Sequence, residues 1–193
     1  MSRMTPARPE GAETTDFLEL VRARRSVRAF KPRPIESPKI EAILEAMNAA
    51  PSAGNLQAYQ VVQVVDPERR RHLARAAHDQ EFVAEAPVVL VFLMDPARSA
   101  AEYGSRGASL YCCQDTAIAA AYTQLAAQAL GLGSVWVGSF DDAAVRRAVD
   151  APETLRPAAL VAIGYPNEKP EPTPRRRLAE MVHEDAYPGK ERR

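Results

Sequence analysis

Apolar residues recur along this chain in two patterns, one typical of amphipathic helices and the other typical of buried strands. Short runs that are rich in apolar and β-branched residues predict strands, and they lie at 59–65, 87–94, 134–137 and 158–165. The run 87–94 is almost wholly apolar, as expected of a strand that is buried on both faces. Helical spacing of apolar positions precedes the first of these runs and separates the others.

Helix boundaries are marked by residues that favour helix ends. Asp16 opens a sequence resembling a capping box, and Ser37, Asp66 and Asp141 each stand where an N-cap is expected. The longest helical pattern covers 106–130, is rich in alanine and ends at a glycine pair. So many small side chains on one helix predict close packing against another helix or a partner subunit.

Helices interleaved with strands predict an α+β or α/β domain with a sheet at its core. We divide the chain into a flexible N-terminal arm (1–15), one folded domain (16–165) and a C-terminal extension (166–193). The extension is rich in proline and carries neighbouring arginines, so we expect it to wrap the domain or a partner subunit.

Composition narrows the classes of function. The 193 residues contain 25 basic and 25 acidic side chains, so no overall positive field would attract nucleic acid or anionic lipid. No apolar run is long enough to span a bilayer, and the start lacks the apolar segment of a secretory signal. Cys112 and Cys113 are adjacent, which disfavours a disulfide between them. We expect a cytoplasmic protein without nucleic-acid or membrane partners.

The segment 24–28 gathers three arginines and one serine, in the order Arg-Arg-Ser-Val-Arg. In an extended segment Arg24, Ser26 and Arg28 would share one face, where they could bind a phosphate through charge-assisted hydrogen bonds. Arg25 would then contribute through its backbone. The alternative is a solvated basic turn whose arginines stabilise the end of a preceding helix. These five residues alone favour that turn.

The segment 51–57, Pro-Ser-Ala-Gly-Asn-Leu-Gln, lies between a predicted helix and a predicted strand. Gly54 permits close approach of the backbone to a ligand, and the amides of Asn55 and Gln57 offer donors and acceptors to a polar ring edge. A plain turn is the alternative, since the same residues favour turns.

Several kinds of chemistry lack their motifs. The run Gly133–Gly138 does not match the dinucleotide fingerprint, and the chain has no P-loop or nucleophile-elbow pattern. The three histidines are far apart in sequence and no metal-ligand spacing is found, so we expect no metal. Any redox chemistry must then come from a bound cofactor.

Taken together, these segments resemble the nitroreductase family of flavin enzymes. Four pieces match in the family's order: R-R-S-x-R at 24–28, P-S-A-G-N-x-Q at 51–57, G-L-G-S-x-W-x-G at 131–138 and the proline- and arginine-containing tail at 164–183. The resemblance implies an α+β fold with a central mixed sheet flanked by helices. It also implies a homodimer with exchanged C-terminal tails and FMN bound at the interface between subunits.

The resemblance also implies roles for particular residues. The arginine segment and the tail would bind the flavin phosphate, the loop of the partner chain would lie along the ring, and the backbone after the third strand would face the flavin N5. No side chain is expected to act as a catalytic acid or base. In the tail, Arg176 is an alternative to Arg175 and Arg177 as the arginine that contacts the phosphate. The expected cofactor contacts are Arg24, Arg25, Ser26, Arg28, Pro51, Ser52, Ala53, Asn55, Gln57, Val137, Gly138, Arg175 and Arg177.

The implied reaction is ping-pong transfer of hydride from NADH or NADPH, through the flavin, to an electron-poor acceptor such as a nitroaromatic or a quinone. Two alternatives stay open: another redox reaction on the same fold, such as reductive dehalogenation or substrate dehydrogenation, and flavin binding without turnover. Ala58 and Tyr59 stand where the family loop commonly continues with proline and tryptophan, so the cavity above the ring and the substrate are open questions.

Overall fold

A computed structural model describes residues 17–187. Seven α-helices lie within this range, and their bounds are α1 (Phe17–Ala23), α2 (Ser37–Asn48), α3 (Pro67–Ala76), α4 (Phe82–Glu85), α5 (Pro96–Arg106), α6 (Cys112–Ala129) and α7 (Asp142–Ala148). The strands are β1 (Tyr59–Val64), β2 (Val88–Met94), β3 (Gly133–Val137) and β4 (Arg156–Gly164). All four predicted strands are confirmed, with ends that differ by at most two residues.

The strands form one sheet in the order β1-β2-β4-β3. Each neighbouring pair is antiparallel, with Val91 opposite Val62 on one side and opposite Leu160 on the other. Within residues 17–187 the single parallel pairing is an isolated bridge between Ser26 and Ser134. The mixed character that the resemblance implied is therefore limited to this bridge, where the arginine segment meets the edge strand β3.

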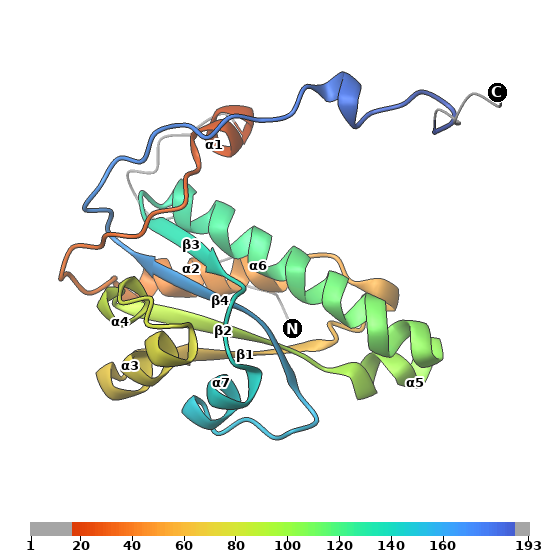
Figure 1. Ribbon diagram of the computed structural model, residues 1–193, viewed down its shortest axis with the longest axis horizontal. Helices are drawn as coiled ribbons and strands as arrows, with labels where there is room; N and C mark the ends of the chain where they lie inside the picture. Colours follow the sequence, from red (N-terminus) through yellow and green to blue (C-terminus); the bar gives the residue numbers. More distant parts are fainter. Residues whose placement is uncertain (1–16, 188–193) are drawn as a thin grey trace, which may run out of the picture.

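Helices cover both faces of the sheet (Figure 1): α2 and α6 pack on one face, and α3, α4 and α7 on the other. Alternate residues of β2 supply the two cores, with Leu90 and Phe92 facing α2 and α6, and Val89 and Val91 facing the opposite layer. Every residue of β2 except Met94 is buried, which confirms the prediction of a strand covered on both faces.

The predicted helix over 106–130 is confirmed as one helical stretch, and an unpredicted helix, α5, precedes it. Gly104 breaks the helical path with φ 55° and ψ −143°, a π-helical turn covers Gly107–Tyr111, and α6 begins only at Cys112. A Cβ at Gly107 would lie 2.4 Å from the Ser99 carbonyl oxygen, so the chain needs glycine to pack against α5 here. The break at Gly104 lies just before the predicted range.

The helix caps were predicted with mixed success. Asp66 and Asp141 accept hydrogen bonds from the backbone N–H groups of Arg69 and Ala144, as expected of N-caps. Ser37 is not a cap, because Glu36 occupies the N-cap position of α2 and Ser37 is the first helical residue. Asp16 and the N-terminal arm lie outside the described residues.

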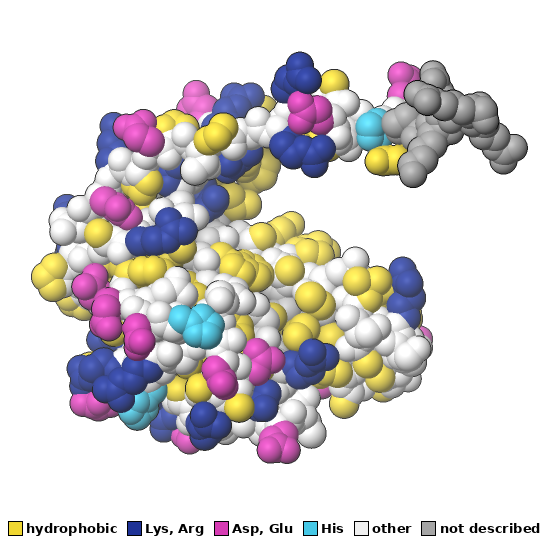
Figure 2. All heavy atoms as spheres, in the orientation of Figure 1, with side chains coloured by type: hydrophobic (Ala, Val, Ile, Leu, Met, Phe, Trp, Pro, Cys, Tyr) yellow, Lys and Arg dark blue, Asp and Glu magenta, His cyan; other side chains and the backbone are white. Residues whose placement is uncertain are grey.

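The C-terminal extension leaves the body of the protein beside α1 and projects away from it (Figure 1). Its described part contains one short 3-10 helix, Leu178–Glu180, and residues 171–187 are exposed throughout. Figure 2 shows hydrophobic side chains gathered on the surface of the body that faces this projecting tail. No helix within 17–187 is long and apolar enough to cross a membrane.

Candidate functional site

The arginine segment is extended and lies against the edge of the sheet. The N–H of Val27 donates to the carbonyl of Ser134 on β3 at 3.1 Å, beside the Ser26–Ser134 bridge. Gly133 makes this approach possible, since a Cβ there would lie 2.8 Å from a methyl group of Val27. Val27 is buried, whereas Arg24 and Ser26 on the other face are half-buried and Arg28 is exposed. The alternating arrangement that the sequence predicted is therefore present.

Arg24 lies in an unusual electrostatic environment. Burial, followed by the positive charges of Arg175 and Arg25, lowers the pKa of Arg24. The fold thus places a tail arginine where its charge acts on a partly buried arginine of the first segment, although the two are 151 positions apart in sequence (175 − 24 = 151). Like charges repel, so two guanidinium groups whose charges act on each other in this way are suited to binding an anion such as a phosphate.

The neighbours of this pair are held by other groups. The guanidinium of Arg25 donates to the carbonyls of Arg22 and Arg24, at 2.5 and 2.9 Å, so it points back to the end of α1, as the basic-turn alternative described for these arginines. Glu168 accepts from the backbone N–H groups of Arg28 and Ala29, which fastens the segment to the start of the tail. Sequence analysis missed Glu168, since nothing in its local sequence marks its distant partner.

The three tail arginines differ in their partners. Arg176 and Arg177 both form ion pairs with Glu180, the latter at 2.8 Å. Arg175 instead donates to the Thr173 hydroxyl at 2.6 Å and has no carboxylate partner among the described residues. Of the three, Arg175 therefore carries the guanidinium charge that is left for an added anion.

The loop 51–57 is a compact turn between α2 and β1. Gly54, Asn55 and Gln57 all have positive φ angles, of 56°, 55° and 50°, a conformation that is costly for residues other than glycine. The Ser52 hydroxyl accepts from the N–H of Gln57 at 2.9 Å. The side-chain amide of Gln57 donates to Asn48 at 3.2 Å, so this group stabilises the loop from within, while Asn55 is exposed.

The loop is also fastened to α6. The N–H of Ala53 donates to the carboxylate of Asp115 at 2.9 Å. Sequence analysis missed Asp115, although one signal was available: it is the only acidic residue between 106 and 130. A cleft of about 600 Å³ lies here, lined by loop residues 51–53 together with Tyr111, Asp115 and other residues of α6.

Val137 and Gly138 end the strand β3. Val137 is buried in the sheet core, and Gly138 is exposed beside the indole of Trp136, to which a Cβ would approach within 3.1 Å. Only their backbone groups are therefore available to a ligand. The structure places Arg24 within reach of the charge of Arg175. Pro51, Ser52 and Ala53 lie together at one cleft, and neither arginine lines that cleft.

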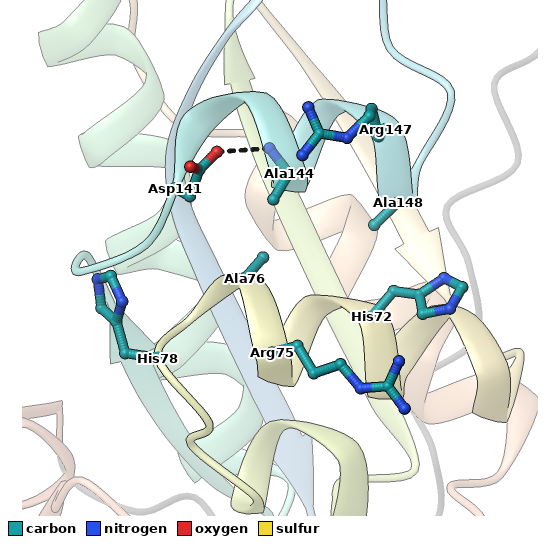
Figure 3. A pocket seen from close by; sticks show the side chains of 8 residues that line it. All are labelled: His72, Arg75, Ala76, His78, Asp141, Ala144, Arg147 and Ala148. Carbon is teal, nitrogen blue, oxygen red and sulfur yellow. Dashed lines mark hydrogen bonds between the residues drawn. The ribbon is translucent and has the colours of Figure 1, made fainter.

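A larger pocket, of about 640 Å³, lies between α3 and α7 and is shown in Figure 3. Its lining consists of His72, Arg75 and Ala76 on α3, Ala144, Arg147 and Ala148 on the facing helix α7, and His78 and Asp141 beside these helices. Its carboxylate, Asp141, already accepts the capping hydrogen bond from the Ala144 N–H at 2.7 Å. None of the expected cofactor contacts lines this pocket, so size alone does not mark the functional site.

Comparison with known proteins agrees with these observations. The model of the nitroreductase family matches residues 21–81 and 71–165. An NADPH-flavin oxidoreductase of Vibrio harveyi is 33% identical over 177 residues, covering 88% of this chain and 74% of the relative. An NADH dehydrogenase of Thermus thermophilus is 34% identical over 186 residues, covering 82% and 91%.

Solved structures show the same relationship. The structure of NADPH:FMN oxidoreductase from Vibrio harveyi complexed with NAD+ superimposes with a TM-score of 0.82 at 32% identity, over 90% of this chain and 79% of that one. The chain belongs to the nitroreductase family. Its α+β fold is that of the family's oxidoreductases.

Proposed function

We propose that this chain is an FMN-dependent oxidoreductase that takes electrons from NADH or NADPH and delivers them to an electron-poor small molecule such as a nitroaromatic or a quinone. The observation that carries the proposal is the pair Arg24 and Arg175. Arg24 is half-buried and Arg175 is exposed, and no carboxylate of the described residues is bonded to either guanidinium. The family relationship supports the same function.

The chain's own residues would bind the cofactor at two ends. Arg24, Ser26, Arg28 and Arg175 form the phosphate end, because guanidinium and hydroxyl donors match phosphate oxygens. Arg177, which sequence analysis also proposed, has its guanidinium paired with Glu180, so we assign it a smaller contribution. The fit is good, since a dianionic phosphate would relieve the repulsion between Arg24 and Arg175.

The ring end would be formed by backbone and small side chains. The loop from Pro51 to Asn55 offers a narrow surface, and Gln57 stabilises that surface through Asn48. The backbone of Val137 and Gly138 would face the reactive edge of the ring. When bound, FMN supplies the redox chemistry itself, accepting hydride from the nicotinamide and passing electrons to the acceptor. The chain positions the ring and needs no side chain as acid or base.

The described surface supports a homodimer in which each flavin site is completed by the second copy. Phe17 and Val21 on α1 and Tyr122 on α6 are exposed apolar residues, and an apolar groove of about 310 Å³ lies between these helices. The tail presents Leu178, which is 73% exposed, with further apolar residues after it. Large exposed apolar groups of this kind mark interaction surfaces, and we propose that the tails exchange between the two copies.

Steady-state kinetics would test the proposed activity. FMN-loaded protein should oxidise NADH or NADPH only in the presence of a quinone or nitroaromatic acceptor, and reciprocal plots at several acceptor concentrations should be parallel, as in a ping-pong mechanism. The control is the same concentration of free FMN. A rate no higher than that of this control, with both nucleotides and both acceptor classes, would contradict the proposed activity. The cytoplasmic setting that the composition favours stays a prediction.

A further inference from the structure

Asp115 is a buried acid in a helix whose other side chains are all uncharged. It lies in the first turn of α6, only 2% of its surface is exposed, and no other acidic residue occurs between 106 and 130. One carboxylate oxygen, Oδ1, accepts the hydrogen bond from the Ala53 N–H at 2.9 Å. Figure 1 shows the α2–β1 loop beside this helix. A long-range bond, between positions 53 and 115, thus joins the loop to the helix.

This carboxylate is costly for the fold. Its second oxygen, Oδ2, is buried and has no hydrogen-bond partner among the described residues. The hydroxyl of Tyr59 is also buried without a partner, and burial together with the charge of Asp115 raises the pKa of that tyrosine. Burying a charged oxygen without a partner is unfavourable, and alanine would suit this helix better. Stability of the helix therefore does not explain the acid.

The loop does require an anchor. Asn55 and Gln57 hold positive φ angles, and backbone in this region persists only where surrounding contacts impose it. Neutral groups within or beside the loop, Ser52, Gln57 and Asn48, supply some of its other side-chain bonds. The Arg98 guanidinium on α5 also donates to the Leu56 carbonyl, on the far side of the loop from Ala53 in sequence. Asp115 supplies the negatively charged contact, which joins the first half of the loop to the sheet-packing helix α6.

We propose that Asp115 is a positioning residue for the flavin: by holding the Ala53 N–H, it fixes the loop 51–57 in the conformation that lies along the ring. The inference rests on the proposed function for its ligand, whereas the anchoring itself is a property of the chain alone. Asp115 touches the loop and not the cofactor, so its effect on the flavin passes through the position of the loop backbone.

Two variants separate the anchor from the charge. Asp115→Ala removes the acceptor, whereas Asp115→Asn keeps an oxygen able to accept from Ala53 and removes the charge. Amide hydrogen exchange of the protein without flavin measures the anchor, and we expect exchange at Ala53 to rise at least tenfold in the Ala variant and to stay within threefold of wild type in the Asn variant. Asp115→Ser, whose hydroxyl is too short to reach, replaces the Ala variant if that variant does not fold.

Binding of FMN, followed by quenching of flavin fluorescence, then tests the positioning role. We expect affinity to fall about tenfold in the Ala variant, the size of one hydrogen bond to a charged group, with an altered visible spectrum of the bound flavin. The Asn variant should restore both. Unchanged exchange at Ala53 in the Ala variant would refute the anchor, and raised exchange with unchanged FMN affinity and spectrum would refute the positioning role. Failure of wild-type protein to bind FMN would refute the proposed function while leaving the exchange result to judge the anchor.

Discussion

The pairing of Arg24 with Arg175 makes a quantitative prediction about FMN binding. We expect Arg175→Ala to remove one charge-assisted contact with the flavin phosphate. Hydrogen bonds to charged groups contribute about 1.5–3 kcal/mol, and each 1.4 kcal/mol changes a dissociation constant about tenfold. The Kd for FMN should therefore rise by roughly 10- to 100-fold. Arg24→Ala should have an effect of at least this size, because Arg24 is more buried than the exposed Arg175.

The assay is titration of protein without flavin against FMN and, in parallel, against riboflavin, which lacks the phosphate. Both variants should bind riboflavin as wild type does, since the ring end of the site is intact. Arg147→Ala on α7 is a charge-matched control, because Arg147 is exposed and lines the pocket between α3 and α7. Arg177→Ala should weaken FMN binding less than Arg175→Ala does, because Glu180 already pairs with Arg177 at 2.8 Å.

Two results would refute this reasoning. If FMN affinity changes by less than threefold in both Arg24→Ala and Arg175→Ala, the pair does not hold the phosphate. If riboflavin and FMN affinities fall equally, the arginines act on the ring or on folding and not on the phosphate.

The double variant tests whether the two arginines act on the same group. If its loss of binding free energy for FMN is smaller than the sum of the two single losses, the two guanidinium groups share one anion.

Three further predictions concern the groups around the site. Gly54→Ala should lower the free energy of unfolding by about 1–2 kcal/mol in urea titrations, because the residue has φ 56° and its Cβ would lie 2.4 Å from the Tyr103 hydroxyl oxygen; an unchanged urea midpoint would contradict this. Tyr59→Phe should leave stability within about 1 kcal/mol of wild type or raise it, since the hydroxyl is buried without a partner; a larger loss would show that the hydroxyl is bonded. The Tyr165 hydroxyl and further hydrogen bonds lower the pKa of Glu36 from 4.5 to about 2. The stability that this contact adds is therefore complete above about pH 4.5 and is lost as the pH falls toward 2. A difference in free energy of unfolding between wild type and Tyr165→Phe that does not shrink over this pH range would contradict the assignment.

Much of the fold was predictable because its signals are local. β-branched and apolar runs identified all four strands, and Asp66 and Asp141 marked helix starts through bonds to residues three positions away. The helix α5 was missed, and its sequence contains Gly104, which is not helical in the structure. Its position against the next segment depends on close packing at Gly107, which residue spacing does not reveal.

The candidate site was predictable in part for the same reason. The segment 24–28 and the loop 51–57 carry recognisable motifs, so their residues could be named. The choice among Arg175, Arg176 and Arg177 required the structure, because it depends on where Glu180 lies relative to the tail. The anchors Glu168 and Asp115 accept hydrogen bonds from backbone N–H groups that are far away in sequence. Almost every residue has a backbone N–H, so the sequence does not show which one a given carboxylate will bind.

The most direct test of the central claim is the identity and amount of flavin in the purified wild-type protein. We predict a yellow protein whose visible absorption is that of a bound flavin, and mass spectrometry of the released chromophore should identify FMN at one molecule per chain. A colourless protein that also fails to bind added FMN would contradict the account, as would release of a flavin without a phosphate as the only bound chromophore.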